Sequence, residues 1–364
     1  MRRILLSRIC CPRCFAPSAV LPSEERNGQI QEGLLRCTRS QHLYPIIRSI
    51  PRLLSTPPED KRGIEAHVQN LIICTGRKPG LDDLNGKQGR TRKSFGREWT
   101  TYQIQRPEED EAYFRSKTGT DPAILRGKWV LDAGCGSGRY ALVAGKAGAE
   151  VVAVNFSQAV ETAAAGTAHL SNVHILQADI FNLPLFPSSF DFIYSLGVLH
   201  HTPNTKKALD RLIPLLNAEG EIALWLYPRW PLPVEIYNRL LRGVTTRLSL
   251  ERVHRLAVLM EPVGLWKLRL LSNSRWWKKL LGQILRGLTI GVSYHPDREI
   301  RICDTFDWFS PPYQWHHTDT EVESWLRGYG LVAIRNLSVG QKHYQFHYGH
   351  GINFKARRSA DDLN

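Results

Sequence analysis

The residues from Val130 to Arg139 constrain the fold more than any other part of the chain. They read Val-Leu-Asp-Ala-Gly-Cys-Gly-Ser-Gly-Arg, an apolar run followed by three glycines at alternating positions. Glycine lets a backbone turn tightly and approach a ligand without a Cβ clash, and a helix that begins there offers unpaired N–H donors. The pattern predicts a buried strand, a loop that cradles a nucleotide and a helix. It differs from the dinucleotide-dehydrogenase pattern G-x-G-x-x-G, because the third glycine comes one residue early.

The next hundred residues continue the pattern with four more apolar strands separated by helical segments. The expected strands are Glu150 to Phe156, Val173 to Gln177, Phe192 onward and Glu221 to Tyr227. Counting the strand at Val130 as the first, the second strand ends near Asn155, at the distance from Gly134 where a ribose-binding side chain belongs. The fourth strand, which begins near Phe192, leads out to His200 and His201. Strands that alternate with helices predict an α/β fold with a parallel sheet.

These motifs together resemble the class I S-adenosylmethionine (SAM) methyltransferases, in the branch that includes ubiquinone and menaquinone methyltransferases. The resemblance runs from about Lys128 to Tyr227. It implies a Rossmann-like seven-stranded sheet whose last strand is antiparallel, and it implies SAM as the cofactor. The cofactor-binding residues that it implies are Asp132, Gly134, Gly136, Gly138, Asn155, Phe156, Asp179, Ile180 and Leu196. Family members usually carry an acid at the position of Asn155, so its bond to a ribose hydroxyl lacks the strength that charge adds.

We expect the first 55 residues to form a separate β-rich module. Cys11 and Cys14 make a C-x-x-C knuckle, and Cys37 opens a second one. The layout resembles the short zinc ribbons that accompany methyltransferases, although Ser40 stands where a fourth cysteine is usual. The expected ligands of one structural zinc ion are Cys11, Cys14, Cys37 and His42, with Cys10 in reserve. The alternative is a ribbon-shaped module without metal.

Composition and patterning divide the chain into five parts. They are the zinc-ribbon-like module (1–55), a linker with N-terminal helices (56–127), the SAM-binding core (128–228), a helical, basic substrate cap with an aromatic loop (229–318), and a final helix with a closing β-hairpin (319–364). The linker includes the proline-rich run from Thr56 to Gly63, and residues 76–93 are rich in glycine and charge. Within the linker region, Ser94 to Trp99 resembles the aromatic segment that family members lay over the cofactor pocket.

Residues 231–291, called the basic insertion below, interrupt the core after its fifth strand. They contain 11 Lys and Arg against three Glu, a net charge of +8 out of the chain's formal +14. Apolar residues recur there at helical spacing, and Trp266, Trp276 and Trp277 follow. Three interpretations stay open: a lid over the substrate, a surface for an anionic membrane or a lipid-like substrate, and RNA binding through phosphates.

Methyl transfer from SAM needs mainly proximity and orientation, and a general base only where the acceptor must lose a proton. His200 and His201 are the first candidates, because they leave the fourth strand at its carboxyl end, where ligands bind in open α/β sheets. His316, in the aromatic loop from Phe306 to His317, is the third.

We therefore predict a SAM-dependent methyltransferase acting on a small or lipid-like acceptor, with O-, C- or N-methylation left open. An RNA base methyltransferase and a non-catalytic SAM-binding or scaffold protein are the alternatives. The seven cysteines show no small-domain disulfide pattern, and no apolar run reaches the length of about 18 residues that spans a bilayer. The expected location is the cytoplasm, with peripheral contact to an anionic membrane as an option. A nucleic acid is the less favoured partner.

Overall fold

The computed structural model describes residues 1–54, 86–102, 106–338 and 351–359. Its strands are β1 (Ser18–Arg26), β2 (Gln29–Cys37), β3 (Leu43–Ile47), β4 (Ile50–Leu53), β5 (Trp129–Ala133), β6 (Glu150–Asn155), β7 (Val173–Ala178), β8 (Phe190–Leu196), β9 (Leu216–Leu226), β10 (Val332–Asn336) and β11 (Ile352–Arg357). Its α-helices are α2 (Lys87–Thr101), α3 (Pro107–Thr118), α4 (Arg139–Lys146), α5 (Ala159–Thr167), α6 (Thr205–Leu212), α7 (Leu232–Thr245), α8 (Leu250–Leu271), α9 (Trp276–Leu288), α10 (Arg298–Phe309) and α11 (Asp319–Gly328). Short 3-10 turns are η1 (Arg3–Ser7), η2 (Pro122–Leu125), η3 (Ile180–Asn182), η4 (Leu199–His201) and η5 (Ile213–Leu215).

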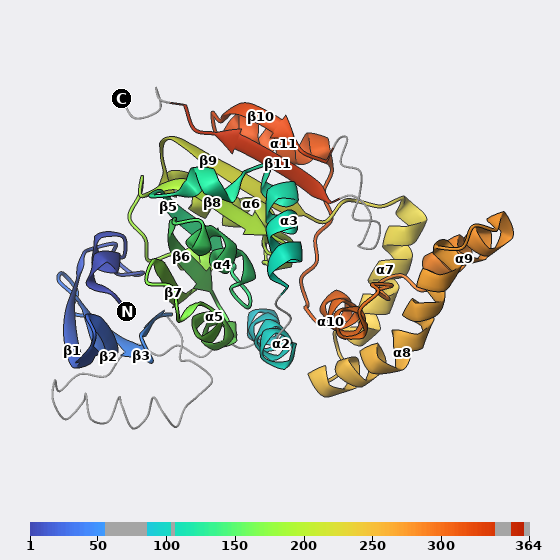
Figure 1. The fold of residues 1–364 in the computed structure, drawn as a ribbon, viewed down its shortest axis with the longest axis horizontal. Helices are drawn as coiled ribbons and strands as arrows, with labels where there is room; N and C mark the ends of the chain where they lie inside the picture. Colours follow the sequence, from blue (N-terminus) through green and yellow to red (C-terminus); the bar gives the residue numbers. More distant parts are fainter. Residues whose placement is uncertain (55–85, 103–105, 339–350, 360–364) are drawn as a thin grey trace.

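The strands form one mixed sheet in the order β1-β2-β3-β4-β7-β6-β5-β8-β9-β11-β10. From β4 to β9 all neighbours in this order are parallel, and β11 is antiparallel to both β9 and β10. The Rossmann-like sheet with an antiparallel last strand is therefore confirmed. Figure 1 shows β1 to β3 at one end of the molecule and the basic insertion at the other.

The sheet has eleven strands in the part of the chain that the structure describes, so the expectation of a seven-stranded sheet was wrong. The seven core strands are present, but β4 pairs in parallel with β7, and this pairing adds the N-terminal strands to the same sheet. An uncovered β7 would leave a row of unpaired N–H and C=O groups at the sheet edge. The buried Arg52 reinforces the junction, since it donates to Oε1 of Gln177 on β7 at 3.0 Å and pairs with Glu161 of α5.

Helices cover both faces of the core sheet, because successive side chains of a strand point to opposite faces. Leu131 of β5 belongs to one buried cluster, to which α6 and α11 contribute Leu212 and Leu326. Its neighbour Val130 belongs to the other, with Phe114 of α3 and Ala141 of α4. A capping box begins the last helix, α11, since the Thr318 hydroxyl accepts from the Glu321 amide and the Glu321 carboxylate accepts from the Thr318 amide.

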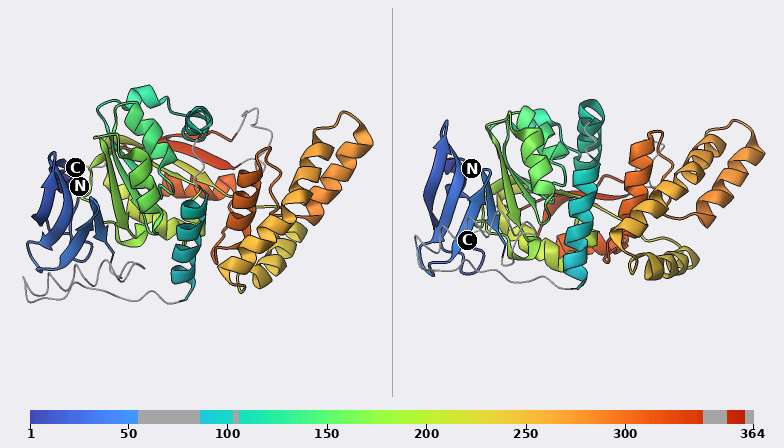
Figure 2. Two further views of the ribbon diagram at one scale, coloured as in Figure 1. Left: turned by 60° about the horizontal axis from the view of Figure 1, so that its bottom comes forward. Right: turned by 90° about the horizontal axis from the view of Figure 1, so that it is seen from below.

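The basic insertion is helical, as expected, and contains α7, α8 and α9. Figure 2 shows α8 and α9 extending away from the sheet and the helices that cover it. One local expectation needs correction, because residues 306–309 of the expected aromatic loop form the last turn of α10. Residues 87–93 of the glycine-rich segment begin α2. The linker from Thr56 to Gly63 lies outside the described residues.

None of the helices in the described ranges combines the length and the apolar character needed to cross a membrane.

Candidate functional site

The glycine loop lies where the order of the sheet reverses. The chain passes from β5 outward to β6 and β7, then returns to place β8 on the other side of β5. In open α/β sheets the crevice at the carboxyl ends of the strands beside such a reversal is the place where ligands bind. Gly134 has a φ of +101°, and a Cβ there would lie 2.4 Å from Cγ1 of Val198. A residue with a side chain cannot occupy this position unless Val198, in the segment that follows β8, moves.

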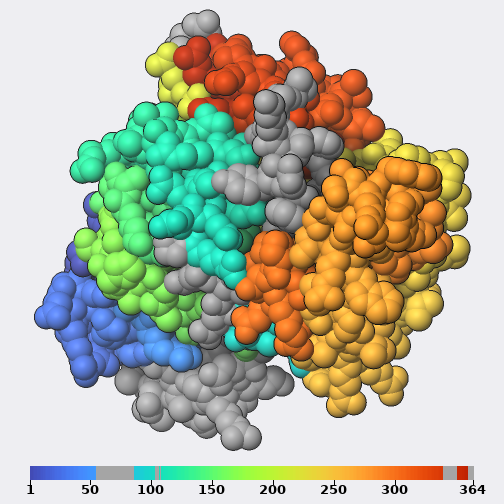
Figure 3. Space-filling model, turned by 45° about the vertical axis from the view of Figure 1, so that its right-hand side comes forward, coloured from blue at the N-terminus to red at the C-terminus, as the bar shows by residue number. Residues whose placement is uncertain are grey.

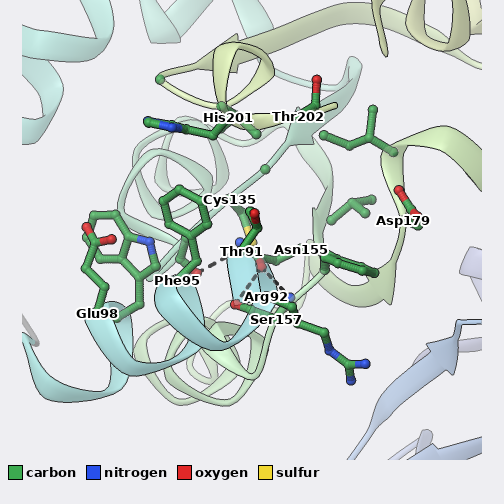
Figure 4. Close-up of a pocket in the computed structure, with 18 of the residues that line it drawn as sticks. Thr91, Arg92, Phe95, Glu98, Cys135, Asn155, Ser157, Asp179, His201 and Thr202 are labelled. Carbon is green, nitrogen blue, oxygen red and sulfur yellow. Dashed lines mark hydrogen bonds between the residues drawn. The ribbon is translucent and has the colours of Figure 1, made fainter. Parts of the chain in front are cut away.

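A cavity opens beside this loop, between the carboxyl ends of the core strands and the helix α2. The loops after β5, β6, β7 and β8 line one part of it, and α2, α10 and the segment after α10 line the rest. Its lining residues include Thr91, Arg92, Phe95, Glu98, Trp99, Gly134, Cys135, Gly136, Ser137, Asn155, Phe156, Asp179, Ile180, Leu196, His201, Asp307 and Tyr313. Figure 4 shows Phe95 and Glu98 on one side of the cavity, Asp179 on the opposite side, and His201 with Thr202 along a third.

Most of the predicted cofactor-binding residues line this cavity. They are Gly134, Gly136, Asn155, Phe156, Asp179, Ile180 and Leu196. Asp132 and Gly138 are not among the lining residues. Asp132 is buried at the end of β5, where burial raises the pKa of its carboxyl to about 7, and Gly138 precedes α4 and packs against Ala163. These two residues support the glycine loop without lining the cavity.

The polar groups at the ends of β6 and β7 are arranged by local hydrogen bonds. Oδ1 of Asn155 accepts from the amide of Ser157 at 2.8 Å and from its hydroxyl at 2.9 Å. The side-chain nitrogen of Asn155 is therefore the group that remains to contact a ligand. Oδ1 of Asp179 accepts from the amide of Phe181 at 2.9 Å, and burial raises the pKa of this carboxyl.

His201 lines the cavity and is held in one tautomer. Its Nδ1 lies 2.9 Å from the backbone oxygen of Tyr313. Because a carbonyl oxygen only accepts hydrogen bonds, Nδ1 carries the proton of the neutral ring. Burial lowers the pKa of His201 to about 3, so the ring is neutral at pH 7 and Nε2 bears a lone pair. Among the described residues Nε2 has no hydrogen-bond partner.

Two acids from different parts of the chain, the half-buried Asp307 and the buried Glu98, complete this end of the cavity. Oδ2 of Asp307 accepts from the Tyr227 hydroxyl at 3.1 Å, whereas its Oδ1 has no hydrogen-bond partner in the described ranges. Burial, followed by the charge of Asp304, raises the pKa of Asp307 to about 7. Glu98 of α2 is buried, and burial followed by the nearby Asp307 raises the pKa of its carboxyl. Its Oε2 also lacks a partner among the described residues.

The other two predicted catalytic histidines do not line the cavity. His200 is fully buried, its ring stacks on Tyr227 with 3.8 Å between centroids, and burial lowers its pKa far below the ordinary value. His316 lies against the basic insertion, where Nδ1 contacts Glu235 at 2.8 Å. Since neither residue lines the cavity, His201 is the predicted histidine that the tertiary structure brings to the site.

The basic insertion does not form the expected wall of the cavity, since none of residues 231–291 lines it. Instead, α2 covers the cavity on the side where a lid was expected. The aromatic segment Ser94 to Trp99 lies on this helix, and the ring of Phe95 meets that of His201 edge to face at 5.2 Å. The sequence pattern pointed to this segment, but nothing in it singled out Glu98 or Asp307. Asp307 reaches the cavity only because the chain returns after the insertion.

The N-terminal cysteines gather as the sequence predicts. The Sγ atoms of Cys11, Cys14 and Cys37 all lie within 4.8 Å of one another. Nδ1 of His42 is 3.7 Å from Sγ of Cys11 and 2.6 Å from Oγ of Ser40, and Ser40 is also in contact with Cys14 and Cys37. Zinc bonds of about 2.3 Å to sulfur and 2.0 Å to nitrogen require this kind of spacing. Cys10 is not part of the group.

Residues 131–224 match the family model described as "Methyltransferase domain". The chain is 30% identical over 118 residues to a demethylmenaquinone methyltransferase of Staphylococcus haemolyticus (strain JCSC1435), which is 31% of this chain and 49% of that protein. It is 28% identical over 126 residues to a demethylmenaquinone methyltransferase of Clavibacter sepedonicus, covering 34% of this chain and 51% of that one. The chain thus spans about half the length of these relatives.

Among solved structures, the chain is similar to a 1,6-didemethyltoxoflavin-N1-methyltransferase of Burkholderia thailandensis, at 17% identity and a TM-score of 0.42 over 78% of this chain and 94% of that one. It is also similar to a magnesium protoporphyrin IX methyltransferase of Synechocystis PCC 6803, at 16% identity and a TM-score of 0.37 over 82% and 96%. The sheet order and the family model identify the domain.

Proposed function

We propose that this chain, which carries a class I SAM-dependent methyltransferase domain over residues 131–224, transfers the methyl group of SAM to an oxygen or nitrogen of a small or lipid-like acceptor. One observation carries the proposal. A single cavity collects the glycine loop, the polar ends of β6 and β7, and the lone pair of His201. Cofactor contacts and a proton acceptor therefore meet at one edge of the sheet.

The residues present fit SAM at this edge. Asp179 and the amide nitrogen of Asn155 offer polar contacts for the adenine and ribose, and Ile180 and Leu196 offer apolar ones. At the other end, Oγ of Ser137 is buried, lines the cavity and has no partner among the described residues. A Cβ at Gly136 would lie 3.0 Å from the indole of Trp99, so glycine is what lets this ring lie close to the loop. The cavity thus offers a ligand both polar and apolar contacts.

When bound, SAM supplies a sulfonium-activated methyl group, so the chain's own residues need to orient the acceptor and hold its proton. Nε2 of His201 takes the proton from an acceptor hydroxyl or amine. The carboxylate of Asp307 stabilises the imidazolium that forms, because opposite charges attract strongly where water is excluded. The backbone oxygen of Tyr313 fixes the ring orientation throughout. Phe95 and Trp99 of α2 exclude water from this end of the cavity.

The free polar atoms at the acceptor end favour a substrate that donates hydrogen bonds. Nε2 of His201, Oδ1 of Asp307 and Oε2 of Glu98 have no hydrogen-bond partners in the described part of the chain. Burying such groups beside a ligand without donors costs free energy. The relatives are named demethylmenaquinone methyltransferases, which supports a small-molecule acceptor over an RNA base.

We also propose one structural zinc ion bound by Cys11, Cys14, Cys37 and His42. The spacing of the three sulfur atoms and the approach of His42 support this ligand set over a metal-free ribbon. The ion would hold β2 and the N-terminal turn together. That would stabilise the part of the sheet that covers the edge of β7.

Calorimetry with SAM, followed by transfer of labelled methyl groups to a panel of quinols, phenols, amines and transfer RNA, tests the proposal. We expect SAM to bind and label to pass to hydroxyl- or amine-bearing small molecules. Absence of SAM binding would favour the scaffold alternative, and labelling of RNA alone would overturn the choice of acceptor.

A further inference from the structure

The exposed large apolar side chains of this protein are concentrated on the basic insertion. In the described part of the chain 20 large hydrophobic residues are exposed, and 14 of these lie between positions 232 and 288. Leu232, Leu259 and Trp276 are 72%, 74% and 75% exposed. Single exposed apolar residues are ordinary on a soluble protein, whereas a concentration of this kind marks an interaction surface.

The helix α9 presents its apolar side outward. Trp276, Leu280, Ile284 and Leu288 recur every four residues and are all exposed. Trp277 and Leu281 lie beside this row, so at 100° per residue the exposed apolar arc is about 140° wide. The side that meets α8 instead carries Gly282, where a Cβ would be 3.0 Å from Leu271. A helix of a soluble core packs the other way, with its apolar arc inside.

The helix α7 has a similar outer row. Leu232, Ile236, Leu240 and Val244 recur at the same spacing and are exposed. Arg242, which lies between two members of this row in sequence, is buried and donates to the backbone oxygens of Trp308 and Pro311. The inner side of α7 is thus polar and anchored, and its outer side is apolar. Figure 3 shows α8 and α9 on the outside of the molecule, with no other coloured segment lying over them.

The charges of the basic insertion leave its surface positive. All three of its glutamates already have partners: Glu235 contacts His316, Glu251 pairs with Arg97 and Arg255, and Glu261 pairs with Arg301. Seven exposed cations, in contrast, have no ion pair among the described residues. They are Arg239, Arg247, Arg252, Arg269, Arg275, Lys279 and Arg286.

We propose that the basic insertion docks this protein on the surface of an anionic lipid bilayer. Its exposed tryptophan and leucine side chains would enter the headgroup and upper acyl region, and its unpaired cations would meet lipid phosphates. Helices that combine an outward apolar arc, tryptophan and a positive charge lie in membrane interfaces in this way. The proposal does not depend on methyl transfer.

Charge decides between a bilayer and a second copy of the chain as the occupant of this surface. Two copies joined through it would bring their unpaired cations together, and like charges at an interface cost free energy. An anionic bilayer satisfies both the apolar arc and the cations. The insertion is also linked to the cavity, because Arg301 of α10 pairs with Glu261 of α8 and Asp307 lies on the same α10.

Sedimentation of the full chain with vesicles tests the proposal, using phosphatidylcholine alone and phosphatidylcholine mixed with phosphatidylglycerol. We expect binding to the mixed vesicles, with binding weakened as salt screens the charges. Calorimetry with SAM on the same preparations reports separately on the proposed function, so a chain that fails to bind SAM can still bind vesicles.

Two triple variants separate the two contributions. Trp276→Ser, Leu280→Ser and Ile284→Ser together should abolish binding to the mixed vesicles at all salt concentrations. Arg275→Gln, Lys279→Gln and Arg286→Gln together should weaken it by about fivefold for each cation removed. The matched controls change exposed residues elsewhere: Leu21→Ser, Ile124→Ser and Val332→Ser for the apolar set, and Arg126→Gln, Lys206→Gln and Lys207→Gln for the cations. Both controls should bind vesicles as the wild type does.

Three results would overturn the proposal. The first is no vesicle binding by the wild type, and the second is equal binding to neutral and anionic vesicles. The third is a concentration-dependent dimer in ultracentrifugation that the apolar variant loses, because that would make a second copy the occupant.

Discussion

Nε2 of His201 lies 3.9 Å from Oδ1 of Asp307, and both atoms belong to residues that line the cavity beside the glycine loop. Neither atom has a hydrogen-bond partner in the described part of the chain. His201 comes from the exit of β8 and Asp307 from α10, on the far side of the basic insertion in sequence. An acceptor hydroxyl or amine placed near both atoms would have its proton accepted by the first and the resulting charge balanced by the second.

The first prediction concerns His201→Gln. Loss of the lone pair at Nε2 should lower kcat by about 10²- to 10⁴-fold, the usual contribution of a general base. The affinity for SAM measured by calorimetry should stay the same. His316→Gln is the control, because His316 lies outside the cavity, and its kcat should remain near that of the wild type. Equal losses in the two variants would remove His201 from the mechanism.

The second prediction is a pH dependence of activity set by Asp307. Burial raises the pKa of this carboxyl to about 7, so the carboxylate forms as the pH rises through this value. The ratio kcat/KM should therefore increase between about pH 6 and pH 8, since this ratio reports groups of the free enzyme. Asp307→Asn should lower the activity and remove this inflection. A variant with the same inflection as the wild type would assign the titration to another group.

The third prediction concerns stability at the same residue. The pKa of Asp307 is about 7 in the folded chain and 3.8 as its ordinary value, so the folded state binds this proton more tightly. The unfolded chain releases the proton first as the pH rises, and stability is lost between about pH 4 and pH 7. Asp307→Asn removes this loss. Urea denaturation should show the variant gaining stability relative to the wild type across this window, on the order of 1 to 4 kcal/mol. A constant difference between the two proteins would contradict the burial of this charge.

The fourth prediction concerns the glycine loop. Gly136 has a φ of +53°, and a side chain there would press on the indole of Trp99. Gly136→Val should weaken SAM binding by about tenfold or more, because strain at such a position costs roughly 1 to 3 kcal/mol. Gly287→Ala is the control, since nothing lies within 4 Å of a Cβ at that exposed position of α9. Unchanged SAM affinity in the valine variant would place the cofactor elsewhere.

The fifth prediction concerns zinc. Protein purified without a histidine tag should carry about one equivalent of zinc, and chelation should lower its thermal stability because structural zinc contributes folding energy. Cys14→Ser should lose the metal. Cys10→Ser should retain it, because Cys10 is not part of the sulfur cluster. A metal content below about a tenth of an equivalent in the wild type would show a metal-free ribbon.

Much of the fold could be predicted from local sequence patterns. The run from Val130 to Ala133 is fully apolar apart from one acid, and such a run has few alternatives to a buried parallel strand. The glycines after it require a turn that only glycine adopts easily. The capping box at Thr318 fixed the start of the last helix in the same local way.

The residues at the acceptor end of the cavity could not be predicted from local patterns. Glu98 has ordinary helical neighbours in sequence, and Asp307 stands in a segment whose aromatic residues suggested a loop. Their burial and raised pKa values exist only because α2 and α10 meet beside His201. The same is true of the eleven-stranded sheet, which depends on the pairing of β4 with β7.

Local sequence patterns were enough to predict the parallel core, the nucleotide-binding loop, the cysteine cluster and the presence of a basic helical insertion. Only the folded chain shows which histidine lines the cavity, which acids join it, and that the insertion turns its apolar side outward. The difference lies in the range of the interactions involved. Strand periodicity, glycine turns and helix caps act between residues close in the chain, whereas burial, charge coupling and exposure depend on contacts between residues far apart in it.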